Sequence, residues 1–347
     1  MRLGGCFRRC ERGRGAKCIG QSRTAHFTNK DCILECPTCR GRSVKIGILH
    51  SGANKVDPAR VAQHMEGLGF ESYWLGEHVV VPEEFIRQSE KRRIETSNPA
   101  DQAISGEAYE HDDSLWQTPD PLVMLARVGA VTTTLKVGTS VCVVPYRHPI
   151  TLAKQVATLD YCCDGRFLFG IGSGWMRGEF DLFRDADFEC RWAQTSDYVA
   201  AMKELWTKPV SRYDGRFAQF PAVRCFPKPT HKPYPPILLA SLNNPKAAKR
   251  VVDWADGWIP IVQSIQEFRD GIGSIKARAN EAGRDLGSLD FTVCGLKGQW
   301  RRYDDQQRFA EAGANRLIIL VDADTLDDTK RDLDAIAKEH KCPVPPG

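Results

Sequence analysis

The order of strand-like and helix-like segments constrains the fold of this chain more than any other feature of its sequence. Short apolar runs alternate with longer segments of helical periodicity from Val44 onward. Because parallel strands need a crossover connection, usually a helix, this alternation predicts a parallel sheet. Asp57-Pro58, Asp120-Pro121 and Asn244-Pro245 are each expected to cap and begin a helix. Eight strands are expected, over residues 44–49, 72–75, 135–144, 167–171, 237–240, 257–261, 290–295 and 316–321.

Eight such units predict an α/β fold whose sheet closes into a (β/α)8 TIM barrel. An open, doubly wound sheet is the alternative, since the number of strands is harder to read from one sequence than their type. Insertions are expected after strands 2 and 4, where residues 82–118 are polar and irregular and residues 208–236 are proline-rich and predicted to be extended. The predicted helix from Pro121 to Ala130 is apolar on nearly all sides, which predicts that it is buried.

A glycine turn follows the fourth predicted strand. Residues Phe167 to Ile171 lead directly into Gly172-Ser173-Gly174, and a helix-compatible segment begins near Trp175. Glycines let backbone amides approach a ligand closely, and a helix N-terminus favours an anion. The turn is therefore a candidate phosphate site, although glycine turns after strands are common and the pattern alone is a weak signal.

The barrel also predicts where the chemistry gathers, because the carboxyl ends of all its strands lie on one face. Residues far apart in the sequence are then expected to form one pocket. The residues that follow strand ends are His50, Glu77, His78, Ser140, Val141, Gly172, Ser173, Gly174, Ala240 and Ser241.

Residues 1–43 form a Cys- and Arg-rich extension that lacks hydrophobic periodicity and is expected to be disordered; the barrel domain is predicted over 44–347. The formal charge of +4 divides into +7 for the extension and −3 for the rest. The extension has no apolar core of the length that a signal peptide needs. Cys32-x3-Cys36-x2-Cys39 is compatible with part of a zinc or iron–sulfur site, but no matching second pair follows, so no metal is predicted. A nucleic-acid-binding basic arm is a further alternative.

The remaining cysteines indicate the compartment. Seven of the thirteen are scattered beyond the extension, several within apolar segments. Scattered buried cysteines are typical of a reducing cytosol, so a cytoplasmic location is predicted. No apolar run of about 18 residues is present, so no membrane span is expected. Because the basic charge is confined to the extension, the barrel domain is not predicted to bind nucleic acid.

Six segments carry motifs in the same order as in a known family. They are GFESYWLGEHV at 69–79, LKVGT at 135–139 through PYRHP at 145–149, LAKQVATLD at 152–160, GRF at 165–167, GIGSGW at 170–175 and ADGW at 255–258. On these motifs the chain resembles the luciferase-like monooxygenase superfamily, and in particular its branch of oxidoreductases that use the deazaflavin coenzyme F420. The resemblance implies a (β/α)8 barrel, which agrees with the strand count.

The resemblance also implies where the coenzyme binds. Gly172, Ser173 and Gly174 would contact its phosphate side, with Trp175 next to them and Ala240 and Ser241 helping from the fifth strand. Ser140-Val141 falls where the F420 branch carries a non-prolyl cis peptide against the ring. Glu77 and His78 match an acidic residue and a histidine beside the ring.

Physical chemistry favours a catalytic proton role for His78. Hydride transfer from a carbon that bears a hydroxyl group needs a base for the proton, and an imidazole with a pKa near 6.5 suits that task. Glu77 is expected to orient the imidazole or to bond the coenzyme ring. A satisfied structural histidine is the alternative for His78, and a structural role is expected for His148, which precedes Pro149 at a helix start.

The substrate is less constrained. Relatives that oxidise glucose 6-phosphate carry an acidic residue directly after the Gly-hydroxyl-Gly turn, where this chain has Trp175, so that activity is not expected. Candidate substrate contacts are His50 and three residues of the 82–118 insertion, which is predicted to be a lid or binding loop: Tyr109, His111 and Trp116.

Three functional hypotheses follow. The first is an F420-dependent oxidoreductase that transfers a hydride to or from a small organic substrate. The second is a monooxygenase that uses O2 and reduced FMN, delivered by a partner flavin reductase. The third is a non-catalytic barrel that senses or stores a coenzyme. The resemblance implies a homodimer, and the substrate stays open because specificity resides in variable loops.

Overall fold

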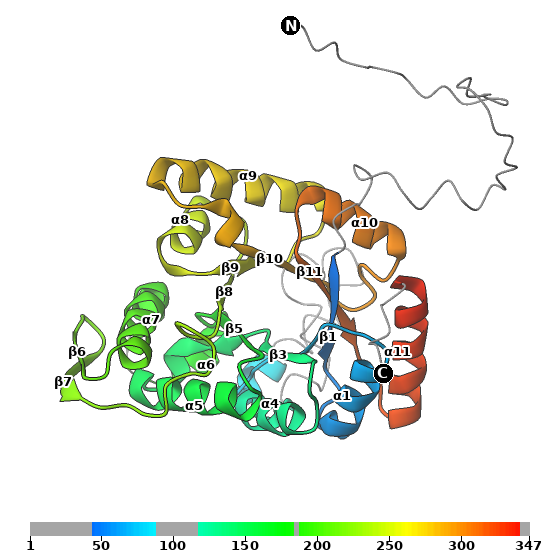
Figure 1. Cartoon of the computed structure of the whole chain (residues 1–347), viewed down its shortest axis with the longest axis horizontal. Coiled ribbons are helices and arrows are strands. Elements are labelled where there is room, and N and C mark those ends of the chain that lie inside the picture. Colours follow the sequence, from blue (N-terminus) through cyan, green and yellow to red (C-terminus); the bar gives the residue numbers. More distant parts are fainter. Residues whose placement is uncertain (1–43, 88–116, 184–186, 341–347) are drawn as a thin grey trace, which may run out of the picture. The chain divides into compact units, whose positions relative to one another are not determined.

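The computed structural model describes residues 44–87, 117–183 and 187–340. Within these ranges, parallel strands close into an eight-stranded barrel of the TIM type with helices around it (Figure 1). β1 pairs with both β2 and β11, and β3 pairs with β5, which completes the ring. The barrel strands are β1 (Lys45–His50), β2 (Ser72–Leu75), β3 (Lys136–Thr139), β5 (Phe167–Gly172), β8 (Ile237–Ala240), β9 (Gly257–Ile259), β10 (Asp290–Cys294) and β11 (Arg316–Val321).

Capped helices alternate with these strands. Asp57, Asp120 and Asn244 each accept a backbone N–H at a helix start, and proline follows each of them, as predicted. His148 caps the next helix by accepting from the Ile150 N–H, which confirms its structural role. The longer helices are α1 (Pro58–Gly67), α4 (Pro121–Ala130), α5 (Pro149–Cys162), α7 (Arg191–Thr207), α8 (Pro245–Trp254), α9 (Ile265–Ala282), α10 (Tyr303–Ala312) and α11 (Leu326–His340). In the described ranges, none is both long and apolar enough to cross a membrane.

Three local predictions need correction. The strand expected over 135–144 is broken: β3 ends at Thr139, β4 (Cys142–Val143) resumes the pairing with β5, and a 3-10 turn, η3 (Val144–Tyr146), follows. The segment 208–236 contains a hairpin of β6 (Ser211–Asp214) and β7 (Gln219–Val223) that was not predicted. Helix α4 is not buried all round, because Val123 faces solvent.

Side chains alternate along each strand between the barrel interior and the layer under the helices. Trp74 lies in the interior, whereas Tyr73 and Leu75 pack in the outer layer. Glycine on a neighbouring strand makes room for the indole, since a Cβ at Gly138 would lie 2.4 Å from the Trp74 ring. The same alternation determines which residues at the strand ends face the mouth of the barrel. The interior cluster comprises Leu49, Trp74, Leu168, Leu238, Ile259, Cys294, Ile318 and Leu320.

A buried ion cluster closes the amino end of the barrel. Arg316, at the start of β11, donates to Glu71 (2.7 Å from Nε to Oε2) and to Asp290 (3.1 Å from Nη1 to Oδ1). Burial alone would raise the pKa of Glu71, but the Arg316 charge and hydrogen bond outweigh it and lower that pKa to about 2. The Glu71 contribution to stability is therefore fully present above its ordinary value of 4.5 and is lost as the pH falls through about 2.

Replacing Arg316 by methionine is expected to lower the free energy of unfolding by about 3 kcal/mol, because it leaves partly buried carboxylates without their cation. Urea unfolding followed by circular dichroism measures this change. The matched control is Arg331→Met, which removes an exposed pair with Asp328 on α11 and is expected to change the stability far less. Equal effects for the two variants would mean that the buried cluster contributes no more than a surface pair.

Candidate active site

The barrel brings several of the predicted residues to the carboxyl ends of its strands. Ser140 and Val141 join β3 to β4, and their peptide bond is cis, as the resemblance implies. A Cβ at Gly172 would lie 2.9 Å from Val141 Cγ2, so the glycine gives Val141 room. The Ser140 hydroxyl lies 3.7 Å from Cys294 Sγ at the end of β10. The Ser140-Val141 bond thus lies where three strand ends meet.

His78 forms a pair with Glu179, a residue that lies outside the predicted site residues. The Nδ1 atom of His78 lies 2.8 Å from Glu179 Oε2, and the imidazole is 12% exposed, whereas the carboxylate is 1% exposed. Glu179 also accepts the backbone N–H groups of Val79 and Val80 at 2.7 and 3.2 Å, and the Tyr146 hydroxyl at 3.2 Å. Burial raises the pKa of Tyr146, and the negative charge of Glu179 raises it further.

Glu77 does not orient the His78 imidazole, which corrects one of its two predicted roles. Consecutive residues of an extended segment point to opposite sides, so Glu77 turns away from His78. Its carboxylate accepts the Val143 N–H at 2.7 Å and forms an ion pair with Arg147, which also binds Asp120. Burial raises the pKa of Glu77 against the opposing effect of Arg147. Glu77 therefore anchors the segment that follows the cis bond.

The glycine turn adopts a conformation that favours glycine. The helix expected after the turn is only partly present. Gly174 has φ 82°, and a Cβ there would lie 3.0 Å from the Tyr146 hydroxyl oxygen. The helix that follows, α6 (Arg177–Phe180), has four residues, which is too short to supply a strong dipole. Ser173 is buried, and its hydroxyl has no hydrogen-bond partner among the described residues. The turn therefore offers a hydroxyl group rather than a helix N-terminus.

Other predicted residues border this region. Trp175 is half exposed, and its ring meets the His78 imidazole edge-on at 5.7 Å. Ala240 ends β8, and Ser241 accepts the Trp258 indole N–H through both its carbonyl and hydroxyl oxygens, at 3.2 and 3.1 Å. The Ser241 hydroxyl group can therefore still donate a hydrogen bond.

His50 lies in a different layer. Its position on β1 has the parity of Ile48, which packs under the helices. The imidazole is buried, and its Nδ1 lies 2.8 Å from the hydroxyl of Tyr73, itself an outer-layer residue. Burial lowers the pKa of His50 to about 4. This environment does not favour the predicted substrate contact. The other three candidate contacts, Tyr109, His111 and Trp116, lie outside the described residues.

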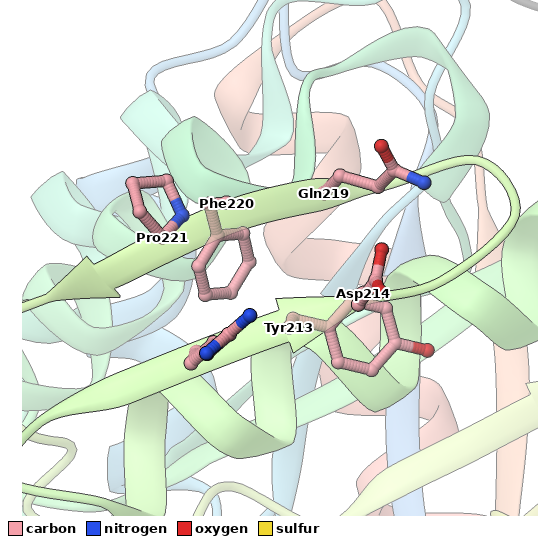
Figure 2. Close-up of a pocket in the computed structure, with 6 residues that line it drawn as sticks. Tyr213, Asp214, Gln219, Phe220 and Pro221 are labelled. Carbon is pink, nitrogen blue, oxygen red and sulfur yellow. The ribbon is translucent and has the colours of Figure 1, made fainter.

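No metal centre is found in the described ranges, where no three His, Cys, Asp or Glu side chains cluster. Cys32, Cys36 and Cys39 lie outside those ranges. An open hollow does occur on the β6–β7 hairpin (Figure 2), lined by Arg212, Tyr213, Asp214, Gln219, Phe220 and Pro221. Tyr213 binds Asp197 of α7, so this hollow belongs to the outer layer and not to the strand ends.

The architecture is that of a TIM barrel with the candidate site residues at the carboxyl ends of its strands. The chain belongs to the luciferase-like monooxygenase family, whose model matches residues 47–318. The family expected from the motifs is thus confirmed, and the chain is an oxidoreductase of the luciferase-like type.

Three proteins are similar to this chain, two in sequence and one in fold. An uncharacterized protein of Mycobacterium tuberculosis (strain H37Rv) is 28% identical over 297 residues, which cover 86% of this chain and 98% of that protein. An FMNH2-dependent dimethylsulfone monooxygenase of Pseudomonas putida is 29% identical over 154 residues, 43% of this chain and 41% of that protein. The structure of an F420-dependent secondary alcohol dehydrogenase with an F420-acetone adduct superimposes with a TM-score of 0.65 at 15% identity, covering 86% of this chain and 99% of that one. An FMNH2-dependent enzyme is thus among the sequence relatives, and an F420-dependent enzyme shares the fold.

Proposed function

We propose that the chain is an F420-dependent oxidoreductase that transfers a hydride between the deazaflavin and a small organic substrate at the carboxyl face of the barrel. The proposal rests on the pair formed by His78 and Glu179. Since the Glu179 carboxylate already accepts hydrogen bonds from Val79, Val80 and Tyr146, it acts only as an acceptor, and Nδ1 of His78 donates the hydrogen bond between the two side chains. Nε2 then keeps a lone pair, and none of the described residues hydrogen-bonds to it.

An imidazole in this state is the base that oxidation of an alcohol requires. When bound, the deazaflavin supplies the hydride acceptor or donor. His78 Nε2 takes the hydroxyl proton as the substrate carbon is oxidised, and it returns that proton in the reverse reduction. Glu179 stabilises the imidazolium that forms, while Glu77 holds the Val143–Arg147 segment in place.

The residues at the strand ends fit such a coenzyme. Ser140 and Val141 are assigned to the ring side, as the resemblance implies. The glycine turn and the end of β8 are assigned to the phosphate side, where Ser173 and Ser241 each have a hydroxyl proton to donate. The phosphate-side assignment comprises Gly172, Ser173, Gly174, Ala240 and Ser241, bordered by Trp175.

An FMNH2-dependent monooxygenase that uses O2 is the second candidate, and the 29% identity to the dimethylsulfone monooxygenase supports it. The same barrel face would serve either coenzyme. A deazaflavin has a carbon atom in place of the flavin nitrogen N5 and does not activate oxygen, so the two functions differ in their oxygen requirement. A homodimer is proposed in both cases, and a flavin reductase is a partner only in the second.

Coenzyme binding separates the two candidates. The purified full-length chain is expected to quench the fluorescence of F420 on binding, with a Kd at least about tenfold lower than for FMN. The test titrates each coenzyme into the same preparation and assays turnover with and without oxygen. Tight FMN binding, no F420 binding and oxygen-dependent turnover would reject the first candidate in favour of the second.

A further inference from the structure

Trp175 and Phe85 form an aromatic wall beside His78. The Trp175 ring meets the His78 imidazole edge-on, with centroids 5.7 Å apart and planes at 86°, and Phe85 meets Trp175 at 5.7 Å and 70°. Trp175 nevertheless stays 50% exposed, and Val79 and Val80, which follow His78 in the chain, are 46% and 44% exposed. Exposed apolar surface of this kind is costly in water and marks a site of interaction.

The wall is held between two segments that are far apart in the sequence. Glu179 binds the backbone of Val79 and Val80, which ties the segment after β2 to α6. The same two segments also approach closely elsewhere, since a Cβ at Gly178 would lie 3.2 Å from Pro82 Cγ. The wall is therefore positioned by packing as well as by the His78–Glu179 pair.

The positive charges near the wall are already paired. Within residues 76–87 and 172–183 both arginines have carboxylate partners, Arg87 with Glu83 at 3.4 Å and Arg177 with Glu189. Arg147, behind Glu77, is likewise paired. A phosphate or carboxylate on the substrate would thus find no unpaired arginine in these segments, while an alkyl chain or ring would cover the exposed indole.

We infer that this aromatic wall selects the substrate: a neutral molecule with an apolar chain or ring next to the carbon that reacts at His78. The inference rests on the proposed function for the position of the reacting carbon. Trp175 is the specificity-determining residue, because it touches the His78 imidazole and carries the exposed apolar surface. Phosphorylated and carboxylated substrates are disfavoured.

Equilibrium binding of an alcohol series tests the inference. The probes are 2-butanol, 2-hexanol and 2-octanol, with glucose 6-phosphate as the charged probe, titrated calorimetrically into the full chain with and without its coenzyme. Affinity is expected to rise about threefold to fourfold per added methylene. Trp175→Ala is expected to weaken 2-octanol binding about tenfold, and Phe85→Ala to act in the same direction. Tyr161→Ala, which truncates an exposed aromatic residue of α5, is the matched control and leaves the series unchanged.

Several outcomes would overturn the inference. One is an affinity that does not depend on the chain length of the alcohol. Another is a Trp175→Ala protein whose affinities for the alcohols equal those of the control variant. A third is glucose 6-phosphate that binds more tightly than 2-octanol. A Trp175→Ala protein that changes its oligomeric state on size exclusion, with its alcohol series intact, would make the wall a subunit interface instead. Failure to bind either coenzyme contradicts the proposed function. A protein that binds its coenzyme but has the same affinity for all three alcohols contradicts only the substrate class.

Discussion

Replacing His78 by alanine is expected to lower the turnover number about 10²- to 10⁴-fold, the usual contribution of a positioned general acid or base. The truncation removes the imidazole that takes the substrate proton and leaves Glu77 and its ion pair with Arg147 in place. Coenzyme affinity is expected to change by less than about twofold, because none of the residues assigned to the coenzyme is altered. Steady-state kinetics and fluorescence titration of the same preparation measure the two quantities.

The matched control is His64→Ala on α1. His64 also forms a 2.8 Å pair with a carboxylate, Asp334, but on the outer helices. Its truncation is expected to leave turnover unchanged. Full turnover in the His78 variant would show that His78 is a structural histidine, and equal losses in both variants would point to a general effect on folding, which thermal unfolding would reveal.

The strands could be predicted because each is a short apolar run with clear ends. The boundaries of β2, β8 and β11 agree with the expected 72–75, 237–240 and 316–321. The resemblance pointed to a cis bond at Ser140-Val141, but the residues of 135–144 read as one strand and do not themselves show that the strand breaks there. The β6–β7 hairpin was missed because the prolines of 208–236 suggested an extended segment, although Pro221 is tolerated in a two-stranded hairpin.

The positions of the site residues could be predicted from topology, but their partners could not. A parallel barrel puts strand ends on one face, so His78 and Gly172 are placed together by the fold class alone. The period of two along a strand already implied that Glu77 and His78 point in opposite directions. Glu179, in contrast, is 101 residues from His78. Their contact depends on how the segments that follow β2 and β5 pack, and an acidic residue five positions after Gly174 is no signal of a buried carboxylate.

Replacing Glu179 by glutamine is expected to reverse the proton arrangement of His78. Val79 and Val80 both donate to Oε1, so the glutamine carbonyl must occupy that position and its NH2 group must face His78. Nδ1 of His78 then has to accept a hydrogen bond, which moves the imidazole proton to Nε2. An imidazole protonated at Nε2 cannot take the hydroxyl proton of an alcohol.

The oxidation direction is therefore expected to slow about 10²- to 10⁴-fold, comparable with the loss caused by a wrong histidine tautomer in a catalytic triad. The Kd of the coenzyme should stay within about threefold. Glu189→Gln, at an exposed carboxylate paired with Arg177, is the matched control and should keep full turnover. Because a misfolded variant would also lose turnover, the ¹⁵N shifts of the His78 ring are measured as well, and a proton still on Nδ1 in a folded, inactive Glu179→Gln protein would contradict the tautomer argument.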